Sequence, residues 1–209
     1  SIYLDAFVNS PGKCAIGAQD AYFEREGAFT GNISAAMLKK EGADYVILGH
    51  SERRSEGDTN EIVNKKVHAA LTERLIVILC IGEHERDEEG AYLSFLNEEI
   101  QESLAGVAPA HFKNIVIAYE PIWAIGKKAK KPATPEDYLE KSIFIRKVVS
   151  TMTNKDIAMK LRILYGGSVN EKNAEEFFAI GRADGFLIGR ASRNPDTYGA
   201  IVQIADNYK

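Results

Sequence analysis

The sequence predicts an α/β fold built on a buried parallel sheet, and three observations support this prediction. Short apolar runs rich in β-branched residues alternate with longer, charged segments of helical period. Most of the runs are continuously apolar, as expected for strands that helices cover on both faces. The alternation of strands and helices indicates repeated βαβ units. The six runs expected as strands are residues 14–19, 44–48, 75–80, 114–118, 161–164 and 185–188.

Several segments between these runs begin with residues that cap helices. Ser, Thr, Asp and Asn side chains accept a hydrogen bond from the first N–H groups of a helix, and proline fits its first turn. The expected starts are Ser34 for a helix that ends at Gly42, Asp58 with Glu61 as a capping box, Thr134 with Pro135 to Asp137, and Asn194 before Pro195.

Length and composition are those of a globular protein, and we expect a single domain. The chain has 209 residues, of which 45% are hydrophobic and 27% charged. Its net charge of −4 argues against a global basic surface for nucleic acid, and no apolar run reaches the ~18 residues of a membrane span. Cys14 and Cys80 lie in apolar runs, so we expect buried thiols in a reducing compartment.

Two architectures fit this pattern, an open doubly wound sheet and a closed (β/α)8 barrel. An open sheet usually carries a glycine-rich phosphate loop after its first strand, and the sequence contains no such motif. A barrel places its chemistry at the carboxyl ends of many strands. Polar or glycine clusters follow five of the six runs, which favours the barrel.

Two side chains at strand ends are candidates for acid–base chemistry. His50 follows the second run and precedes a helix, whose dipole would hold the imidazole neutral; the alternative is a histidine that bonds locally. Glu120 closes the fourth run, and the Pro121–Trp123 stretch after it could be the stiff hinge of a lid. The alternative for Glu120 is an ion pair with an arginine.

Glycine turns follow the last two runs. Residues 166–168 and 189–192 offer backbone N–H groups and hydroxyls, and Arg190 adds a cation. In an eightfold barrel the loops after the last two strands commonly bind a phosphate. The alternative is two tight turns that need glycine for their backbone.

The remaining histidines and cysteines are weaker candidates. His68 lies within an expected helix and His111 precedes a strand, so we interpret both as surface or core residues. His84 belongs to the charge run 83–89, which we interpret as a solvated helix start. No His or Cys cluster has the spacing of a zinc site, and neither cysteine is placed as an activated nucleophile.

Six stretches carry a recognisable pattern in their order and strand-end placement. They are Gly27–Ser34, Tyr45–Arg54, Cys80–Glu83, Ala118–Gly126, Tyr165–Ser168 and Gly185–Gly189. Together they resemble the triosephosphate isomerase family over nearly the whole chain, which implies a (β/α)8 TIM barrel. Another phosphate-sugar barrel isomerase is disfavoured, because the His50 cluster and the lid after Glu120 match one chemistry.

The resemblance implies an enzyme that interconverts dihydroxyacetone phosphate and glyceraldehyde 3-phosphate. Glu120 would move a proton between the carbons beside the carbonyl, through an enediolate, and neutral His50 would polarise the carbonyl oxygen. The residues implied to support the pocket are Glu52 and Cys80, and those implied to bind the substrate phosphate are Gly126, Ser168, Gly189 and Arg190. The resemblance implies no metal or organic cofactor.

The same resemblance implies a cytoplasmic homodimer that acts in glycolysis and gluconeogenesis. In that dimer, the loop Phe29–Gly31 would reach into the neighbouring subunit. The implied partners are a small phosphorylated triose and a second copy of the chain, with no nucleic acid and no membrane.

Three features depart from the family's pattern. The sequence begins where the family has passed its second strand, so the Asn-x-Lys that the family carries at the end of its first strand is not among these residues. The loss of such a preorganised charge typically costs ~3 kcal/mol or more of transition-state stabilisation. The lid, residues 124–133, is longer and more basic than usual, with Pro132 near its far hinge, and Arg190 replaces the family's second glycine after the last strand.

A barrel without its N-terminal βαβ portion exposes strand edges. Six strands are two short of eight, and open edges on hydrophobic strands favour aggregation, edge pairing or borrowing of the missing piece. We expect residues 1–209 to be one incomplete barrel domain, either part of a complete enzyme or a protein that assembles differently, with impaired isomerase activity. The alternative is a degenerate, catalytically weak phosphate-metabolite binder or assembly subunit of the same fold.

Overall fold

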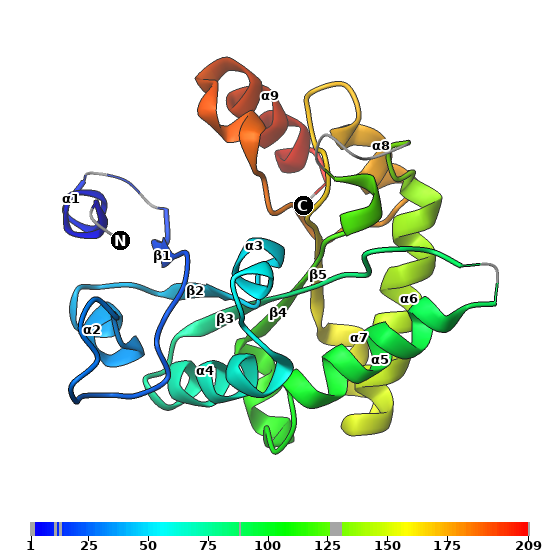
Figure 1. Cartoon of the computed structure of the whole chain (residues 1–209). Helices are drawn as coiled ribbons and strands as arrows, with labels where there is room; N and C mark the ends of the chain where they lie inside the picture. Colours follow the sequence, from blue (N-terminus) through cyan, green and yellow to red (C-terminus); the bar gives the residue numbers. More distant parts are fainter. Residues whose placement is uncertain (1–2, 11, 13, 88, 126–130, 209) are drawn as a thin grey trace. The chain divides into compact units, whose positions relative to one another are not determined.

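The computed structural model describes residues 3–10, 12, 14–87, 89–125 and 131–208 (Figure 1). Within these ranges, five strands form one sheet in the order β1-β2-β3-β4-β5. The strands are β1 (Gly17–Ala18), β2 (Tyr45–Leu48), β3 (Ile76–Ile81), β4 (Ile115–Tyr119) and β5 (Arg162–Tyr165). Spatial order follows chain order, as it does when helices connect successive parallel strands. The prediction of an α/β fold is confirmed.

The first three strands run parallel and are largely buried. Gly17 of β1 pairs with Tyr45 of β2. Strand β2 pairs with β3 from Tyr45 opposite Ile76 to Leu48 opposite Leu79. The side chains of Leu48 and Leu79 are at most 1% exposed, as expected for a sheet covered by helices.

The run 185–188, expected as a sixth strand, does not form a strand in the described part of the chain. Phe186 makes a single parallel bridge with Tyr165. The N–H of Tyr165 donates to the carbonyl of Gly185, and the N–H of Leu187 donates to the carbonyl of Tyr165, both at 3.0 Å. Gly185 has a φ of +154°, which departs from the extended backbone that a longer ladder needs.

The first expected strand, residues 14–19, is shorter than predicted. Only Gly17 and Ala18 belong to β1, so Cys14 precedes the strand and is exposed. The prediction of a buried thiol is therefore wrong for Cys14. It is confirmed for Cys80, which lies in β3.

The chain divides into two compact units, which are described separately below. Unit 1 is Ser1–Cys80 with Gln101–Val116, and unit 2 is Ile81–Ile100 with Ile117–Lys209. The single-domain interpretation stays a prediction.

The helices of unit 1 start where the sequence supplies a cap. They are α1 (Leu4–Val8), α2 (Ala35–Lys40), α3 (Ser51–Ser55), α4 (Asn60–Thr72) and the 3₁₀ helix η1 (Pro109–Asn114). The Ser34 hydroxyl accepts from the N–H of Met37 at 3.2 Å, and Gly42 follows α2 with a φ of +87°, which confirms the predicted helix. Helix α4 packs against both α2 and β2 (Figure 1).

The predicted capping box of Asp58 with Glu61 is wrong. Helix α4 is capped by Thr59, whose hydroxyl accepts from the N–H of Ile62 at 3.2 Å. The Asp58 carboxylate instead lies 2.6 Å from Nζ of Lys66, which also bonds Asp20 at 2.9 Å. Because Lys66 is only 3% exposed, its ammonium needs anionic partners more than the helix needs a second cap.

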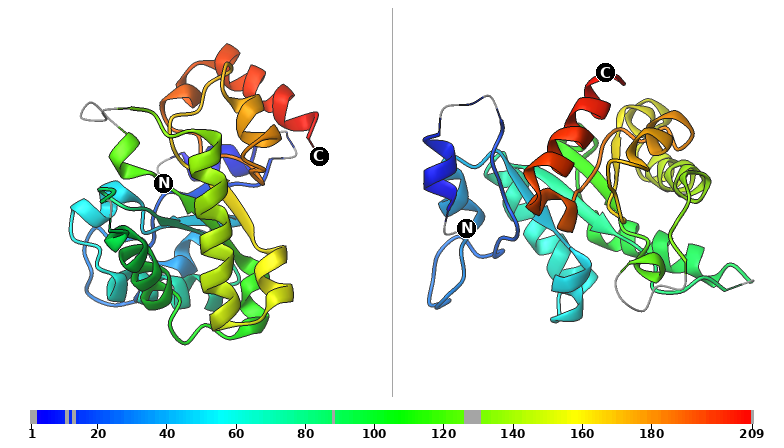
Figure 2. Two further views of the ribbon diagram at one scale, coloured as in Figure 1. Left: turned by 90° about the vertical axis from the view of Figure 1, so that its right-hand side faces the viewer. Right: turned by 90° about the horizontal axis from the view of Figure 1, so that it is seen from above.

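Unit 2 holds most of α5 (Ala91–Ser103) and several helices that follow it in the chain. These are η2 (Ile122–Ala124), α6 (Pro135–Met152), α7 (Lys155–Lys160), α8 (Ala174–Ala179), η3 (Arg190–Arg193) and α9 (Pro195–Asp206). Thr134 and Asp137 form the capping box of α6, and Asn194 caps α9, so both predicted starts are confirmed. Helices α8 and α9 lie side by side in both views of Figure 2. Among the helices in the described ranges, none has the length and apolarity needed to cross a membrane.

Aromatic side chains form part of the core of unit 2. The rings of Tyr165 and Phe177 stack with centroids 3.9 Å apart. The fully buried ring of Tyr138 meets the Tyr165 ring edge-on, and its hydroxyl donates to the carbonyl of Ile163 at 2.6 Å. The hydroxyl therefore has a partner although its ring lies in an apolar core. This packing joins β5 to α6 and α8.

Gly82, which follows β3 directly, has no room for a side chain. A methyl group there would lie 1.7 Å from the carbonyl oxygen of Glu120. The N–H of Glu120 also donates to the carbonyl of Ile81 at 2.8 Å. The ends of β3 and β4 therefore approach each other through a position that only glycine can occupy.

We predict that Gly82→Ala destabilises the protein, because the backbone at Glu120 must move to admit the methyl group. Overpacking of this kind costs about 1–3 kcal/mol or more. Gly199→Ala in α9 is the matched control, because a methyl group at Gly199 meets nothing within 4 Å. Alanine in a helix should raise the free energy of unfolding by about 0.5–1 kcal/mol. Urea unfolding measures both, and equal effects of the two substitutions would contradict the close approach.

Candidate active site

In unit 1, His50 lies at the carboxyl end of β2 and caps helix α3. Its Nδ1 accepts a hydrogen bond from the backbone N–H of Glu52 at 3.3 Å. A ring nitrogen that accepts a hydrogen bond carries no proton, so this contact favours the neutral imidazole with its proton on Nε2. This arrangement leaves Nε2 as the ring nitrogen that can donate a hydrogen bond, and the catalytic role of His50 stays a prediction.

Arg54 ties the turn at His50 to the end of β3. Its Nε donates to the carbonyl of Gly49 at 2.8 Å, and its Nη2 donates to the carbonyl of Cys80 at 3.5 Å. Gly49 has a φ of +70°, and a methyl group there would lie 3.0 Å from the Arg54 guanidinium. The absence of a side chain at Gly49 therefore leaves room for the Arg54 guanidinium beside the turn.

The two residues expected to support His50 contribute mainly through their backbones. The side chain of Glu52 is exposed, while its N–H fixes the imidazole. Cys80 is buried, and its carbonyl accepts from Arg54. Their supporting roles stay predictions.

In unit 2, Glu120 follows β4 directly and is 3% exposed. Two glycines lie against it. Gly82 contacts its backbone, and a methyl group at Gly166 would lie 3.0 Å from its Cγ. The N–H of Gly166 donates to the carbonyl of Tyr119 at 2.8 Å, which brings the turn after β5 beside this carboxylate. The structure therefore places a buried carboxylate at the end of a strand, between glycine backbones.

Three of the four residues predicted to bind phosphate lie in exposed turns of unit 2. Ser168 is exposed, and its carbonyl accepts from the side chain of Asn173 at 2.9 Å. Gly189 and Arg190 are exposed at the start of η3, and a methyl group on Gly189 would meet nothing within 4 Å. Gly126 lies outside the described residues. Phosphate binding at these positions stays a prediction.

The interpretation of residues 83–89 as a solvated helix start is wrong for Glu83, although Asp87 of this run accepts from the first N–H groups of α5. Helix α5 begins at Ala91, and the described residues before it are not helical. His84 is exposed as expected, but Glu83 is 1% exposed. The Glu83 carboxylate is drawn into unit 2 because three side-chain donors meet it there.

A single oxygen of Glu83 accepts all three hydrogen bonds. The donors to Oε1 are the Tyr119 hydroxyl at 2.8 Å, the Trp123 indole N–H at 2.9 Å and Nε of Arg86 at 3.0 Å. Burial, followed by the charge of Glu83, raises the pKa of Tyr119, so its hydroxyl stays protonated and keeps donating. Because Glu120 lies between Tyr119 and Trp123 in the chain, Glu83 anchors the backbone on both sides of it.

Sequence reasoning missed this network, although one signal for it was present. Glu83 lies two residues after the last residue of β3, near the strand-end position that Glu120 occupies directly after β4. A carboxylate at that position points to the same strand-end edge. The charged residues that follow it favoured the interpretation of a solvent-exposed segment instead.

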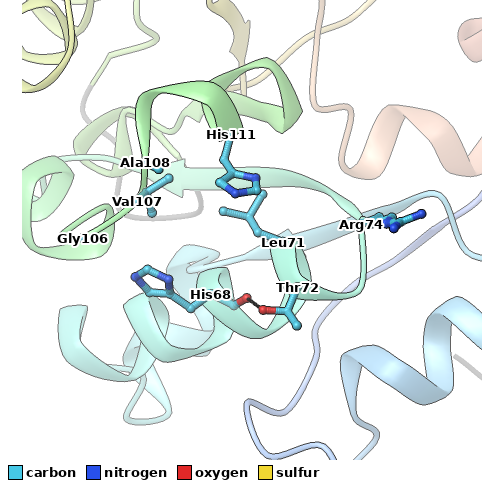
Figure 3. Close-up of a pocket in the computed structure, with 8 residues that line it drawn as sticks. All are labelled: His68, Leu71, Thr72, Arg74, Gly106, Val107, Ala108 and His111. Atoms are coloured by element: carbon cyan, nitrogen blue, oxygen red, sulfur yellow. Dashed lines mark hydrogen bonds between the residues drawn. The ribbon is translucent and has the colours of Figure 1, made fainter.

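A cavity of about 350 Å³ lies elsewhere in unit 1, at the carboxyl end of α4 (Figure 3). His68 and Leu71 of α4 line it together with His111 of η1, and Nε2 of His68 lies 2.8 Å from the carbonyl of Ala105. Because α4 ends just before β3 begins, the cavity lies at the amino end of that strand. The predicted site residues of unit 1 are at the carboxyl ends. In the described part of the chain, no cluster of three or more His, Cys, Asp or Glu residues could hold a metal ion.

The sequence model of the family described as triosephosphate isomerase matches residues 1–205. The chain belongs to the triosephosphate isomerase family. That family consists of aldose–ketose isomerases with the (β/α)8 TIM-barrel fold, so the fold class and enzyme class expected from the sequence are confirmed.

Individual relatives agree with the family match. The triosephosphate isomerase of Chloroherpeton thalassium is 47% identical over 193 residues, which are 91% of this chain and 76% of that protein. The triosephosphate isomerase of Dictyoglomus thermophilum is 42% identical over 205 residues, which are 97% of this chain and 82% of that protein. The triosephosphate isomerase of Aquifex aeolicus is 44% identical over 189 residues, which are 90% of this chain and 75% of that protein.

Asp137 gives a prediction for the pH dependence of stability. Burial opposes ionisation of its carboxylate, but hydrogen bonds from the N–H of Thr134 and from Arg86 outweigh burial and lower its pKa below 3.8. A carboxylate with a depressed folded-state pKa stabilises the protein above its ordinary pKa, and this contribution is lost as the pH falls through the folded-state pKa.

We therefore expect Asp137→Asn to lower the free energy of unfolding by about 1 kcal/mol at neutral pH, as loss of a capping partner does. The difference between the variant and the natural chain should shrink below about pH 4. Urea unfolding at neutral and acid pH measures it, with exposed Asp5→Asn as the control. A difference that grows as the pH falls would contradict the ion pair.

Proposed function

We propose that this chain interconverts dihydroxyacetone phosphate and glyceraldehyde 3-phosphate, with Glu120 as the base. The observation that carries the proposal is the buried carboxylate of Glu120 at the carboxyl end of β4, held between Gly82 and Gly166. A carboxylate shielded from water, in a chain of this family, is suited to removing a proton from a carbon acid.

In the proposed reaction, Glu120 takes a proton from the carbon beside the substrate carbonyl. The C–H electron pair forms the enediolate double bond, and the carbonyl oxygen gains negative charge. The neutral His50 donates its Nε2 proton in a hydrogen bond toward that oxygen, consistent with the contact from Glu52 to Nδ1. Glu120 then returns its proton to the former carbonyl carbon. The proton of the neighbouring substrate hydroxyl passes to the former carbonyl oxygen, so that a new carbonyl forms where the hydroxyl was, with no net change in atoms or electrons.

The finer assignments belong to the same proposal. Glu52 and Cys80 support His50, and the substrate phosphate binds at the predicted residues Gly126, Ser168, Gly189 and Arg190. The reaction places the protein in glycolysis and gluconeogenesis, and we propose a cytoplasmic homodimer built from single barrel domains.

Deuterium uptake from D₂O tests the role of Glu120 even where net turnover is slow. The natural chain should exchange a carbon-bound proton of dihydroxyacetone phosphate for deuterium, observed by proton NMR. Glu120→Gln should lower this exchange by at least about a hundredfold, because the amide cannot act as a base. Glu175→Gln, at an exposed position on α8, is the matched control and should exchange at the natural rate.

Two outcomes would overturn the assignment. Equal exchange by Glu120→Gln and the natural chain would remove Glu120 from the chemistry. Binding of dihydroxyacetone phosphate without any exchange by the natural chain would favour the alternative of a phosphate-metabolite binder.

A further inference from the structure

Arg86 joins two segments of unit 2 that lie far apart in the chain. Toward Trp123, its guanidinium carbon lies 4.3 Å from the indole centroid, and its Nε donates to the same Glu83 oxygen that the indole bonds. Toward helix α6, its Nη1 donates to Oδ1 of Asp137 at 2.5 Å. One planar side chain therefore contacts both the turn after Glu120 and the start of α6.

Both ends of this connection are fixed locally. Trp123 belongs to η2, which begins only two residues after Glu120. Asp137 closes the capping box of α6, where its Oδ2 accepts from the N–H of Thr134 at 2.9 Å. A shift of Arg86 would therefore move the turn after Glu120 relative to the first turn of α6.

The chemistry of the contact suits a guanidinium in particular. The Arg86 side chain is 21% exposed, and its guanidinium carbon lies near two aromatic rings, 4.3 Å from the Trp123 centroid and 5.8 Å from the Tyr92 centroid. A guanidinium can stack on an indole and donate in its plane to two carboxylates at once, whereas an ammonium cannot. Burial opposes its charge, but hydrogen bonds from Arg86 to Tyr119, Asp137 and Glu83 outweigh this and raise its pKa.

Glu83 makes the arrangement sensitive to loss of Arg86. Its Oε1 accepts three donors, while its buried Oε2 has no hydrogen-bond partner among the described residues. Without the guanidinium, a buried carboxylate would keep only two neutral donors. The carboxylate and the indole bonded to it would then rearrange to find water or another donor.

We propose that Arg86 is a positioning residue for Glu120: it fixes Trp123, and with it the turn that follows the base, against the start of helix α6. Arg86 itself touches no reacting atom. The kinetic part of this inference rests on the proposed function, because it takes Glu120 as the base. The structural part does not, because it concerns the environment of Trp123 alone.

The chain offers a direct probe, because Trp123 is its one tryptophan. The experiment compares the natural chain with Arg86→Gln, Arg86→Lys and Asp137→Asn, and records indole emission, kcat, KM and melting temperature. The exposed Arg25→Gln is the matched control, since it removes an arginine whose ion pair with Glu73 lies at the surface of unit 1.

We expect Arg86→Gln to shift the Trp123 emission to the red and to lower kcat by about 10- to 100-fold, as misplacement of a catalytic group does. The KM should stay within about threefold, because no substrate contact is removed. Arg86→Lys should show a smaller red shift of the Trp123 emission and a smaller loss of kcat than Arg86→Gln. Asp137→Asn, which keeps the stacked cation, should give smaller changes in the same direction, and Arg25→Gln should give none.

A lower melting temperature with unchanged emission and unchanged kcat would show a merely structural arginine and overturn the proposal. A red shift without loss of kcat in an active natural chain would overturn the positioning role. If Arg86→Gln does not fold, Arg86→Lys and Asp137→Asn decide, and unchanged emission in both overturns the proposal.

The two hypotheses fail in distinguishable ways. A natural chain that neither isomerises nor exchanges deuterium defeats the proposed function. In that case the emission of the variants still decides whether Arg86 holds Trp123, since it requires no substrate.

Discussion

The Glu83 carboxylate is the group on which the arrangement around the proposed base depends. It is buried at the end of β3, and one of its oxygens accepts from Tyr119, Trp123 and Arg86. Tyr119 precedes Glu120 and Trp123 follows it closely. The backbone just after a strand usually has few fixed contacts. Here the side chains of Tyr119 and Trp123, on either side of Glu120, donate to the same carboxylate oxygen, and this restricts the backbone of Glu120 from both sides.

Close backbone approach is the second requirement. Gly82 and Gly166 allow the ends of β3 and β5 to lie against Glu120, where any side chain would collide with its carbonyl or its Cγ. Unit 1 uses a similar combination at β2, where Gly49 makes room for Arg54 and the arginine bonds backbone carbonyls on both sides. In both units, one long polar side chain beside a glycine adds hydrogen bonds at the strand ends to those between the backbones.

Local sequence patterns predicted the features that depend on neighbouring residues. Continuous apolar runs marked the buried strands, and a polar residue two positions after the end of a run marked His50 and Glu120. The capping box at Thr134 also follows from residues three apart. These predictions hold because hydrophobic burial and helix capping act over a few residues of the chain.

Features that depend on distant residues could not be predicted in this way. Asp58 leaves the helix start because Lys66 and Asp20 form a buried charge cluster, and the charge run at Glu83 folds inward because donors arrive from β4 and η2. The roles of the predicted site residues likewise come from the family resemblance, and experiments with substrate test them. Periodicity does not encode such long-range partners.

A double-mutant cycle between Glu83 and Tyr119 tests most directly whether this shared acceptor organises the strand end. Glu83→Met removes the acceptor at similar length, Tyr119→Phe removes one donor, and urea unfolding gives the free energy of each variant and of the pair. We predict a coupling of about 1–3 kcal/mol between the two substitutions. Effects that add within about 0.5 kcal/mol would contradict it.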